Sequence, residues 1–234
     1  MLLTSLRKEL KFLANSEKAK ILQGFFKTGE GQYGEGDVFL GITVPVQRSF
    51  ARKYLDLSFG DLQELLNGKI HEERLVALMI LVLRYKQVSE SERFEIFEFY
   101  VRNYKNINNW DLVDLSAPNI VGCYLLNKKR DVLYKFAKSN NLWKKRIAIL
   151  STFTFIRNNQ FDDTLNISEI FLSDKHDLIH KAVGWMLREV GKRDLRVEED
   201  FLKRYYKKMP RTMLRYAIEK FEEVKRKKYL NGEI

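Results

Sequence analysis

The chain has 234 residues, of which 45% are hydrophobic, and 42 lysines and arginines against 31 acidic residues give it a net charge of +11. A membrane-spanning helix needs about 20 apolar residues, but the longest apolar run is the nine residues from Leu75 to Leu83. Cys123 is the only cysteine, which excludes an internal disulfide and a cysteine zinc site and is typical of a cytoplasmic protein. The charge favours a polyanionic partner, although a generally basic surface would give the same excess.

The first elements expected along the chain are a helix and a glycine-rich segment. Residues 1–14 place charges at Arg7 and Lys8 within an apolar pattern, which indicates an amphipathic helix rather than a signal peptide. Residues 28–37 (TGEGQYGEGD) contain the spacing G-x-G-x-x-G, which in dinucleotide-binding proteins follows a strand. Here residues 17–26 have a helical pattern instead. The sequence therefore favours a flexible connector, with DNA contact as an option, over a phosphate-binding loop.

Later segments repeat apolar residues every three or four positions, which is the spacing of an α-helix. They are RLVALMILVLRY at 74–85, ERFEIFEFYVRNY at 92–104, KRIAILSTFTFI at 145–156 and KAVGWMLREV at 181–190. Ser89 and Glu92 form a capping-box pattern at the start of the second segment. Pro118 is expected to break or kink a helix soon after Asp114.

Small residues recur along the chain at nearly constant intervals. Ala77, Ala148, Ala182 and Ala217 each lie inside a helical pattern at spacings of 71, 34 and 35 residues, and 71 is close to twice 35. Such a period is typical of stacked helical pairs. We therefore predict an all-α solenoid in one domain, 1–234, with one set of helices lining a concave face. A non-repetitive helical bundle is the alternative.

Trp110 and Asp114 are the main candidates for chemistry. On a helix they lie one turn apart on one face, whereas Asp111 points roughly 100° away from Trp110. In a basic chain, an aromatic ring beside a carboxylate suggests a site for a cationic group on a polyanion, such as DNA carrying a damaged base. The alternatives are core packing for Trp110 and Trp185, and an ion pair or capping role for Asp114. Trp143 is expected to be structural.

Basic residues recur on the predicted repeats of the second half. Arg146 borders an apolar face, where it would pair with a buried acid or reach a phosphate. The residues that would follow a phosphate backbone, unless they form a solvated face, are Lys144, Lys145, Arg188, Lys192, Arg193, Arg211 and Arg215. His176 and His180 have no cysteine nearby and lack the glutamate of a metalloprotease helix, so a surface pair without a metal is expected.

Five segments, taken together and in order, carry a family pattern. They are FLGITVPVQR at 39–48, NNWDLVD at 108–114, WKKRIAILSTF at 143–153, HKAVGWMLREVGKRD at 180–194 and MPRTMLRYAIEKF at 209–221. This pattern resembles the AlkD family of DNA alkylation-repair glycosylases. The resemblance implies a right-handed α-solenoid of HEAT-like repeats with a concave basic DNA-binding face, to which Arg48 would also contribute.

The resemblance also implies an activity, the excision of cationic purines alkylated at N3 or N7 from double-stranded DNA. The family's catalytic aspartate falls on Asp114, its aromatic pair on Trp110 and Trp185, and its active-site arginine on Arg146. Alkylation makes the purine a good leaving group, so the carboxylate would stabilise the oxocarbenium-like sugar and position water. The family is understood to hold the lesion without a base-binding pocket. No metal or organic cofactor is implied, and a monomer is expected.

One family residue has no single counterpart. The family has a tyrosine in its first helices, for which Phe25 or Phe26 is nearest here, while Tyr33 lies in the glycine-rich segment. No lysine is singled out as a Schiff-base nucleophile, which predicts a monofunctional glycosylase. Two alternatives are a non-catalytic relative that binds damaged or branched DNA, and a scaffold that binds acidic proteins.

Overall fold

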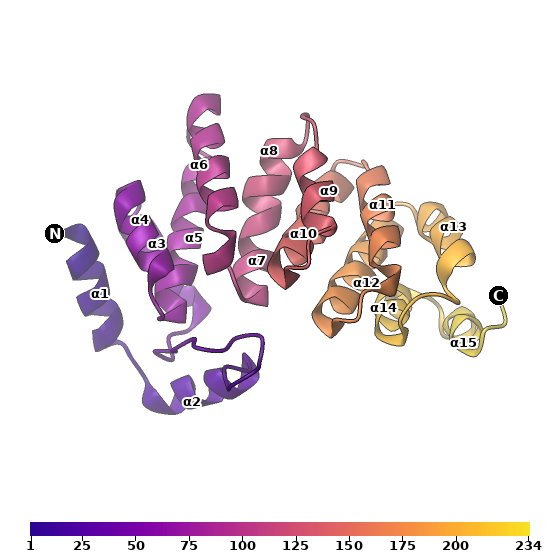
Figure 1. Ribbon diagram of the computed structural model, residues 1–234, viewed down its shortest axis with the longest axis horizontal. Helices are drawn as coiled ribbons and strands as arrows, with labels where there is room; N and C mark the ends of the chain where they lie inside the picture. Colours follow the sequence, from indigo (N-terminus) through magenta and orange to yellow (C-terminus); the bar gives the residue numbers. More distant parts are fainter. The chain divides into compact units, whose positions relative to one another are not determined.

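A computed structural model describes residues 1–234 and consists of helices joined mostly by short turns, with one long connection at residues 26–43 (Figure 1). The β-type pairing is limited to an isolated parallel bridge between Val38 and Ile70. None of the helices combines the length and the apolar character that a membrane crossing requires. The contacts divide the chain into two compact units, Met1–Ser116 and Ala117–Ile234. That the two units act as one domain stays a prediction.

The first unit is built around one buried helix. Its helices are α1 (Leu2–Phe12), α2 (Ser16–Phe25), α3 (Val44–Lys53), α4 (Phe59–Asn67), α5 (His71–Tyr85), α6 (Glu90–Arg102), a 3-10 turn (Tyr104–Asn106) and α7 (Trp110–Ala117). The long apolar run of the sequence lies in α5, which packs against α3 and α4 and is buried along nearly its whole length. The predicted capping box of Ser89 and Glu92 is confirmed at the start of α6.

The second unit stacks its helices in pairs. Its elements are a π-helical turn (Pro118–Gly122), α8 (Cys123–Leu125), α9 (Asp131–Ala137), α10 (Leu142–Arg157), α11 (Asp162–Ile170), a 3-10 turn (Phe171–Ser173), α12 (Asp177–Gly191), α13 (Leu195–Tyr205), α14 (Arg211–Ala217), a 3-10 turn (Ile218–Lys220) and α15 (Glu223–Asn231). α12 packs against both α10 and α14. Gly184 permits the close approach of α14, because a Cβ there would lie 2.4 Å from the carbonyl oxygen of Met213.

The predicted repeat is confirmed by where the helices begin. The second helices of successive pairs, α5, α7, α10, α12 and α14, start at residues 71, 110, 142, 177 and 211, which are intervals of 32 to 39 residues. Ala77, Ala148, Ala182 and Ala217 lie on four of these helices and are completely buried. The all-α repeat fold is therefore the correct prediction, rather than a non-repetitive bundle.

Pro118 does not end its helix. The chain passes from α7 through the π-helical turn Pro118–Gly122 into α8. A proline has no N–H and crowds the preceding turn, and a π-helical turn is one way in which a helix accommodates the missing hydrogen bond. The carbonyl oxygen of Pro118 accepts a hydrogen bond of 2.6 Å from the Thr154 hydroxyl on α10. The helix therefore continues, with its altered turn fastened to α10.

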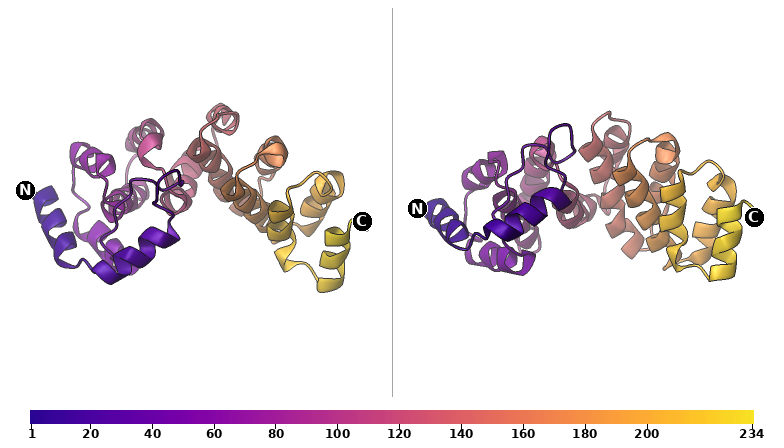
Figure 2. Two further views of the ribbon diagram at one scale, coloured as in Figure 1. Left: turned by 60° about the horizontal axis from the view of Figure 1, so that its bottom comes forward. Right: turned by 90° about the horizontal axis from the view of Figure 1, so that it is seen from below.

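The glycine-rich segment is folded rather than extended. It follows the helix α2, as expected, and Figure 2 shows it turned back beside that helix. The amide of Gly34 donates to the carbonyl oxygen of Lys27 at 3.1 Å. Gly34 is buried, and a Cβ there would lie 2.5 Å from the carbonyl oxygen of Phe26. The segment ends at Asp37, which is also buried, while residues 29–32, 35 and 36 are exposed. Gly34 and Asp37 thus anchor a set of turns, and the flexibility of the connector stays a prediction.

Candidate functional site

The start of α7 carries the first two predicted site residues. Trp110 and Asp114 are both half-buried and lie on this one α-helix, which confirms their spacing of one turn. The Asn109 side chain accepts a hydrogen bond of 2.8 Å from the amide of Trp110. Asp111 lies in the first turn, where the helix dipole favours a negative charge. Asn109 directly before Trp110 and Asp111 directly after it therefore give the helix a polar start at the first site residue.

Trp110 belongs to a stack of aromatic rings. Its ring stacks on Phe26 with centroids 5.0 Å apart, and Phe26 stacks on Phe39 at 5.0 Å. Phe39 in turn stacks on the imidazole of His71 at 4.4 Å. Phe26 and Phe39 are buried, so these two rings form a small core against which Trp110 packs. Phe25 differs, because it is 62% exposed and meets Trp110 edge-on at 5.8 Å.

A buried cluster of charged residues lies behind this stack. His71 Nδ1 is 2.9 Å from Asp37 Oδ2, and His71 Nε2 is 2.8 Å from Asp111 Oδ2. Arg74 forms an ion pair with Asp37 and donates to the side chain of Asn108. His71 is not among the residues predicted from the sequence; its signal there is the polar tetrad HEER at the start of the most apolar helix. Asp111 is thus engaged with His71, in line with its lower rank as a candidate.

The hydrogen bonds and charges of the cluster shift the pKa values of His71 and Asp37. Burial alone would lower the pKa of His71, but hydrogen bonds to Asp111 and Asp37 outweigh it and raise the pKa to about 9. Burial would raise the pKa of Asp37, but the hydrogen bond with His71 and the charge of Arg74 lower it below its usual value. At neutral pH the cluster therefore holds an imidazolium between two carboxylates.

The segment 39–48 is fastened to the same part of α5. The carboxylate of Glu72 is completely buried and accepts hydrogen bonds from the amides of Leu40, Gly41 and Ile42, the one from Gly41 being 2.8 Å. Gly41 has a φ of +81°, and a Cβ there would lie 2.2 Å from the carbonyl oxygen of Asn15, so this position requires glycine. These contacts explain the glycine of the FLGITVPVQR segment.

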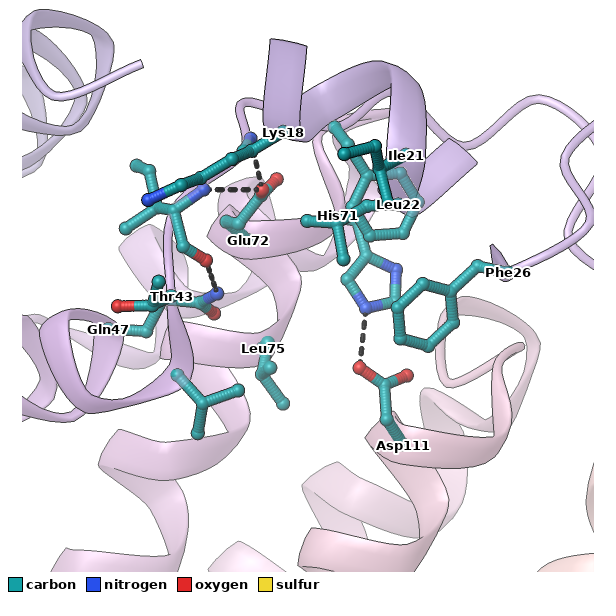
Figure 3. A pocket seen from close by; sticks show the side chains of 14 residues that line it. Lys18, Ile21, Leu22, Phe26, Thr43, Gln47, His71, Glu72, Leu75 and Asp111 are labelled. Atoms are coloured by element: carbon teal, nitrogen blue, oxygen red, sulfur yellow. Dashed lines mark hydrogen bonds and ion pairs between the residues drawn. The ribbon is translucent and has the colours of Figure 1, made fainter. Parts of the chain in front are cut away.

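A cavity of about 200 Å³ lies beside this cluster. Figure 3 shows the imidazole of His71 directed at Asp111 on one side of it, with Phe26 next to the ring. Gln47 lines the opposite part and donates to the carbonyl oxygen of Ile42 at 2.7 Å. Most of the other lining side chains are apolar, so the cavity is a partly open gap in the first unit's packing.

The remaining predicted site residues lie in the second unit. Arg146 is buried, and its Nη1 donates to the carbonyl oxygen of Leu178 at 2.6 Å, which ties α10 to the start of α12. Trp185 is half-buried, and its Nε1 donates to Glu189 at 3.1 Å. Trp143 is buried, as the prediction of a structural role requires. The structure thus places Trp110 and Asp114 on one helix and the other two on separate helices.

Most of the predicted phosphate contacts have partners within the chain. Three of them form ion pairs: Lys145 with Asp174 at 2.6 Å, Lys192 with Glu189 at 2.6 Å, and Arg188 with Glu219. Arg211 donates a hydrogen bond to the carbonyl oxygen of Leu230. The ammonium group of Lys144 lies over the ring of Phe136. Three further predicted phosphate contacts are exposed: Arg48, Arg193 and Arg215. In α12, His176 caps the first turn and His180 donates to the carbonyl oxygen of Asp174.

Comparison with known proteins identifies a family for the chain. Residues 6–221 match the family of DNA alkylation repair enzymes. A solved structure described as a predicted DNA alkylation repair enzyme from Enterococcus faecalis aligns with a TM-score of 0.71, covering 90% of this chain and 97% of that chain at 18% identity. At that identity the likeness shows a shared fold. No curated protein matches the chain. Because the family match spans nearly its whole length, the chain belongs to the family of DNA alkylation repair enzymes.

Proposed function

We propose that the protein is a monofunctional DNA glycosylase that excises cationic purines alkylated at N3 or N7, such as 3-methyladenine and 7-methylguanine, from double-stranded DNA. The observation that carries this proposal is the pairing of Trp110 with Asp114 on α7, within a chain whose family repairs alkylated DNA. Asp114 is the proposed catalytic carboxylate. The net charge of +11 supports a polyanionic partner.

The proposed reaction needs a carboxylate but no general acid. The bond between C1′ and the purine nitrogen breaks, and its electron pair neutralises the positive charge of the alkylated base. The sugar is left as an oxocarbenium-like cation, which the negative charge of Asp114 stabilises in a half-buried setting where water screens it less. Water then adds to C1′ and gives up a proton, which leaves an abasic site and a free base. No step requires a metal, an organic cofactor or a covalent bond to lysine.

The aromatic residues have proposed roles in holding the nucleotide. Trp110 and the exposed ring of Phe25 offer faces and edges to a sugar or a cationic base, and contacts of a cation with such rings contribute about 0.5–2 kcal/mol. The resemblance assigns Trp185 and Arg146 to contacts with the DNA as well. We propose that the protein acts as a monomer in the cytoplasm, associated with the nucleoid through DNA.

The first test is release of 7-methylguanine and 3-methyladenine from methylated duplex DNA by the wild type and by Asp114→Asn. We expect Asp114→Asn to lose excision by more than about 100-fold, because removing one group that stabilises developing charge has effects on the order of 100- to 1,000-fold. Its dissociation constant for DNA should stay near that of the wild type. Asp162→Asn, at an exposed carboxylate on α11, is the matched control and should keep full activity.

Three outcomes would contradict the proposal in different ways. Equal excision by Asp114→Asn and the wild type would remove Asp114 from the chemistry while leaving a glycosylase. Absence of excision by the wild type, combined with tight and salt-sensitive DNA binding, would instead identify a non-catalytic protein that binds damaged or branched DNA. Strand cleavage without alkali treatment would show lyase activity and contradict a monofunctional enzyme.

A further inference from the structure

His71 joins three segments that are far apart in the sequence. It is the first residue of α5 and is completely buried. Its Nδ1 faces Asp37 at the end of the glycine-rich segment, and its Nε2 faces Asp111 in the first turn of α7. Nothing in the proposed reaction uses this histidine, so its burial between two carboxylates needs a separate explanation.

The charges of the cluster balance, and both nitrogens of the His71 imidazole are hydrogen-bonded. A carboxylate only accepts hydrogen bonds, so both ring nitrogens must donate, and an imidazole with two N–H groups carries a positive charge. Arg74 supplies a second positive charge beside Asp37. Two cations and two anions therefore neutralise each other, which is the condition under which buried charges are tolerated.

The residues around the start of α7 are all connected to this cluster. Arg74 donates to Asn108, and the side chain of Asn109 donates to Asp37 at 3.4 Å. Asp111 bonds to His71 directly, and Trp110 stacks on Phe26, whose ring also lies against His71 at 5.1 Å. These contacts fix the positions of residues 108–111, and they also fix the rotation of the first turn of α7 about the helix axis. Asp114 follows one turn later on the same rigid helix.

We propose that His71 is a positioning residue, whose hydrogen bonds to Asp37 and Asp111 lock the start of α7 to the glycine-rich segment and thereby orient Trp110 and Asp114. This inference rests on the proposed function for the meaning of that orientation. It also gives the glycine-rich segment a role: its turns deliver Asp37 to the cluster. The charged groups that face His71 are Asp37, Asp111 and Arg74, with Glu72 and Lys18 lining the same cavity.

The test replaces His71 with glutamine, which keeps a hydrogen-bond donor but removes the charge and one of the two bonds. Excision would be measured at saturating protein in a single turnover, beside the dissociation constant for methylated duplex DNA. We expect His71→Gln to lower the excision rate per folded molecule about tenfold or more while the dissociation constant changes less than threefold. A histidine that only added stability would lower the folded fraction and leave that rate unchanged. His180→Gln is the matched control, at a histidine that donates to a backbone carbonyl in the second unit.

A second measurement does not depend on activity. Incorporation of 5-fluorotryptophan gives one ¹⁹F resonance for each of the three tryptophans, and Trp110→Phe identifies that of Trp110. His71→Gln should shift the Trp110 resonance and leave those of Trp143 and Trp185 in place. In the wild type, the Trp110 resonance should titrate with a midpoint near pH 9 as the pKa of His71 is passed, and this titration should vanish in His71→Gln.

The outcomes separate this inference from the proposed function. If the wild type releases no base, the glycosylase proposal fails, and the ¹⁹F measurement still decides whether His71 positions Trp110. An unmoved Trp110 resonance together with an unchanged excision rate in His71→Gln would overturn the inference. If His71→Gln does not fold, Asp111→Asn keeps the shape of the pair and removes one charge, and the wild-type titration requires no variant. A Trp110 resonance that neither moves in Asp111→Asn nor changes with pH in the wild type would then overturn it.

Discussion

Phe25 and Phe26 are neighbours in the chain but face different surroundings. Phe26 is buried and stacked between Trp110 and Phe39, so its removal would leave a cavity and cost about 3–5 kcal/mol of folding free energy. Phe25 is 62% exposed and touches the edge of Trp110. Because an exposed ring contributes little to folding and Phe25 lies beside Trp110, we propose Phe25 rather than Phe26 as the counterpart of the family's tyrosine.

Phe25→Ala should therefore lower excision with little effect on stability. We expect a loss of about twofold to tenfold, because an aromatic contact contributes about 0.5–1.5 kcal/mol and 1.4 kcal/mol corresponds to a factor of ten. The melting temperature should change by no more than about 2 °C. Phe25→Tyr should keep or raise the activity. Phe12→Ala, at an aromatic residue of α1 that is 88% exposed, serves as the control. Full activity in Phe25→Ala would exclude Phe25 from the site.

At the scale of the element, helices and their ends follow from local patterns. The capping box of Ser89 and Glu92 and the spacing of Trp110 and Asp114 depend on residues three or four apart, which the sequence displays directly. The cluster around His71 could not be predicted in the same way. His71 is separated from Asp37 by 34 residues and from Asp111 by 40, and only the packed fold brings these side chains together. Pro118 correctly marked an irregular turn, but the sequence did not show that the chain stays helical through it or that this turn bonds to Thr154 on α10.

The contact between α12 and α14 depends on a glycine, and this gives a prediction about packing. A Cβ at Gly184 would lie 2.4 Å from the Met213 carbonyl oxygen and 2.5 Å from the Tyr216 Cβ. Gly184→Ala should therefore lower the free energy of unfolding by about 1–3 kcal/mol, the usual cost of overpacking. Gly24 in α2 has no atom within 4 Å of such a Cβ. Gly24→Ala should instead raise stability, by up to about 1 kcal/mol.

Urea denaturation of the two glycine variants beside the wild type would measure both changes. The pair is informative because each variant adds the same methyl group to a helix, so the gain in helix propensity is shared. Opposite signs would assign the difference to the approach of α14. Equal stabilisation by both variants would mean that α12 and α14 can separate without cost, contrary to the tight contact at Gly184.

At the scale of the whole molecule, the net charge of +11 is a poor guide to how many cations are available for DNA. Lys145, Arg188 and Lys192 are held by carboxylates within the chain. The composition therefore predicts the class of partner, while the number of phosphate contacts depends on which helices present cations without acidic neighbours. The periodic sequence predicted those helices correctly as repeats, but it could not reveal the ion pairs between them.

Two variants that each remove one positive charge, Arg215→Gln and Lys203→Gln, would separate the effect of a specific phosphate contact from the effect of net charge. In the second unit the predicted DNA contacts all lie on the second helices of the pairs or at their ends, α10, α12 and α14, and Arg215 on α14 is exposed. Lys203 lies on α13, a first helix, where its side chain is 57% exposed and 3.9 Å from Asp200. Each phosphate contact contributes about 0.9 to the slope of log K against log salt concentration. Arg215→Gln should therefore reduce that slope by about one and weaken binding equally for all DNA sequences, whereas Lys203→Gln should change neither. DNA binding by both variants, measured from low to physiological salt, would check these two expectations. Equal changes in the two variants would mean that affinity follows total charge. The second helices would then form no defined DNA-binding face.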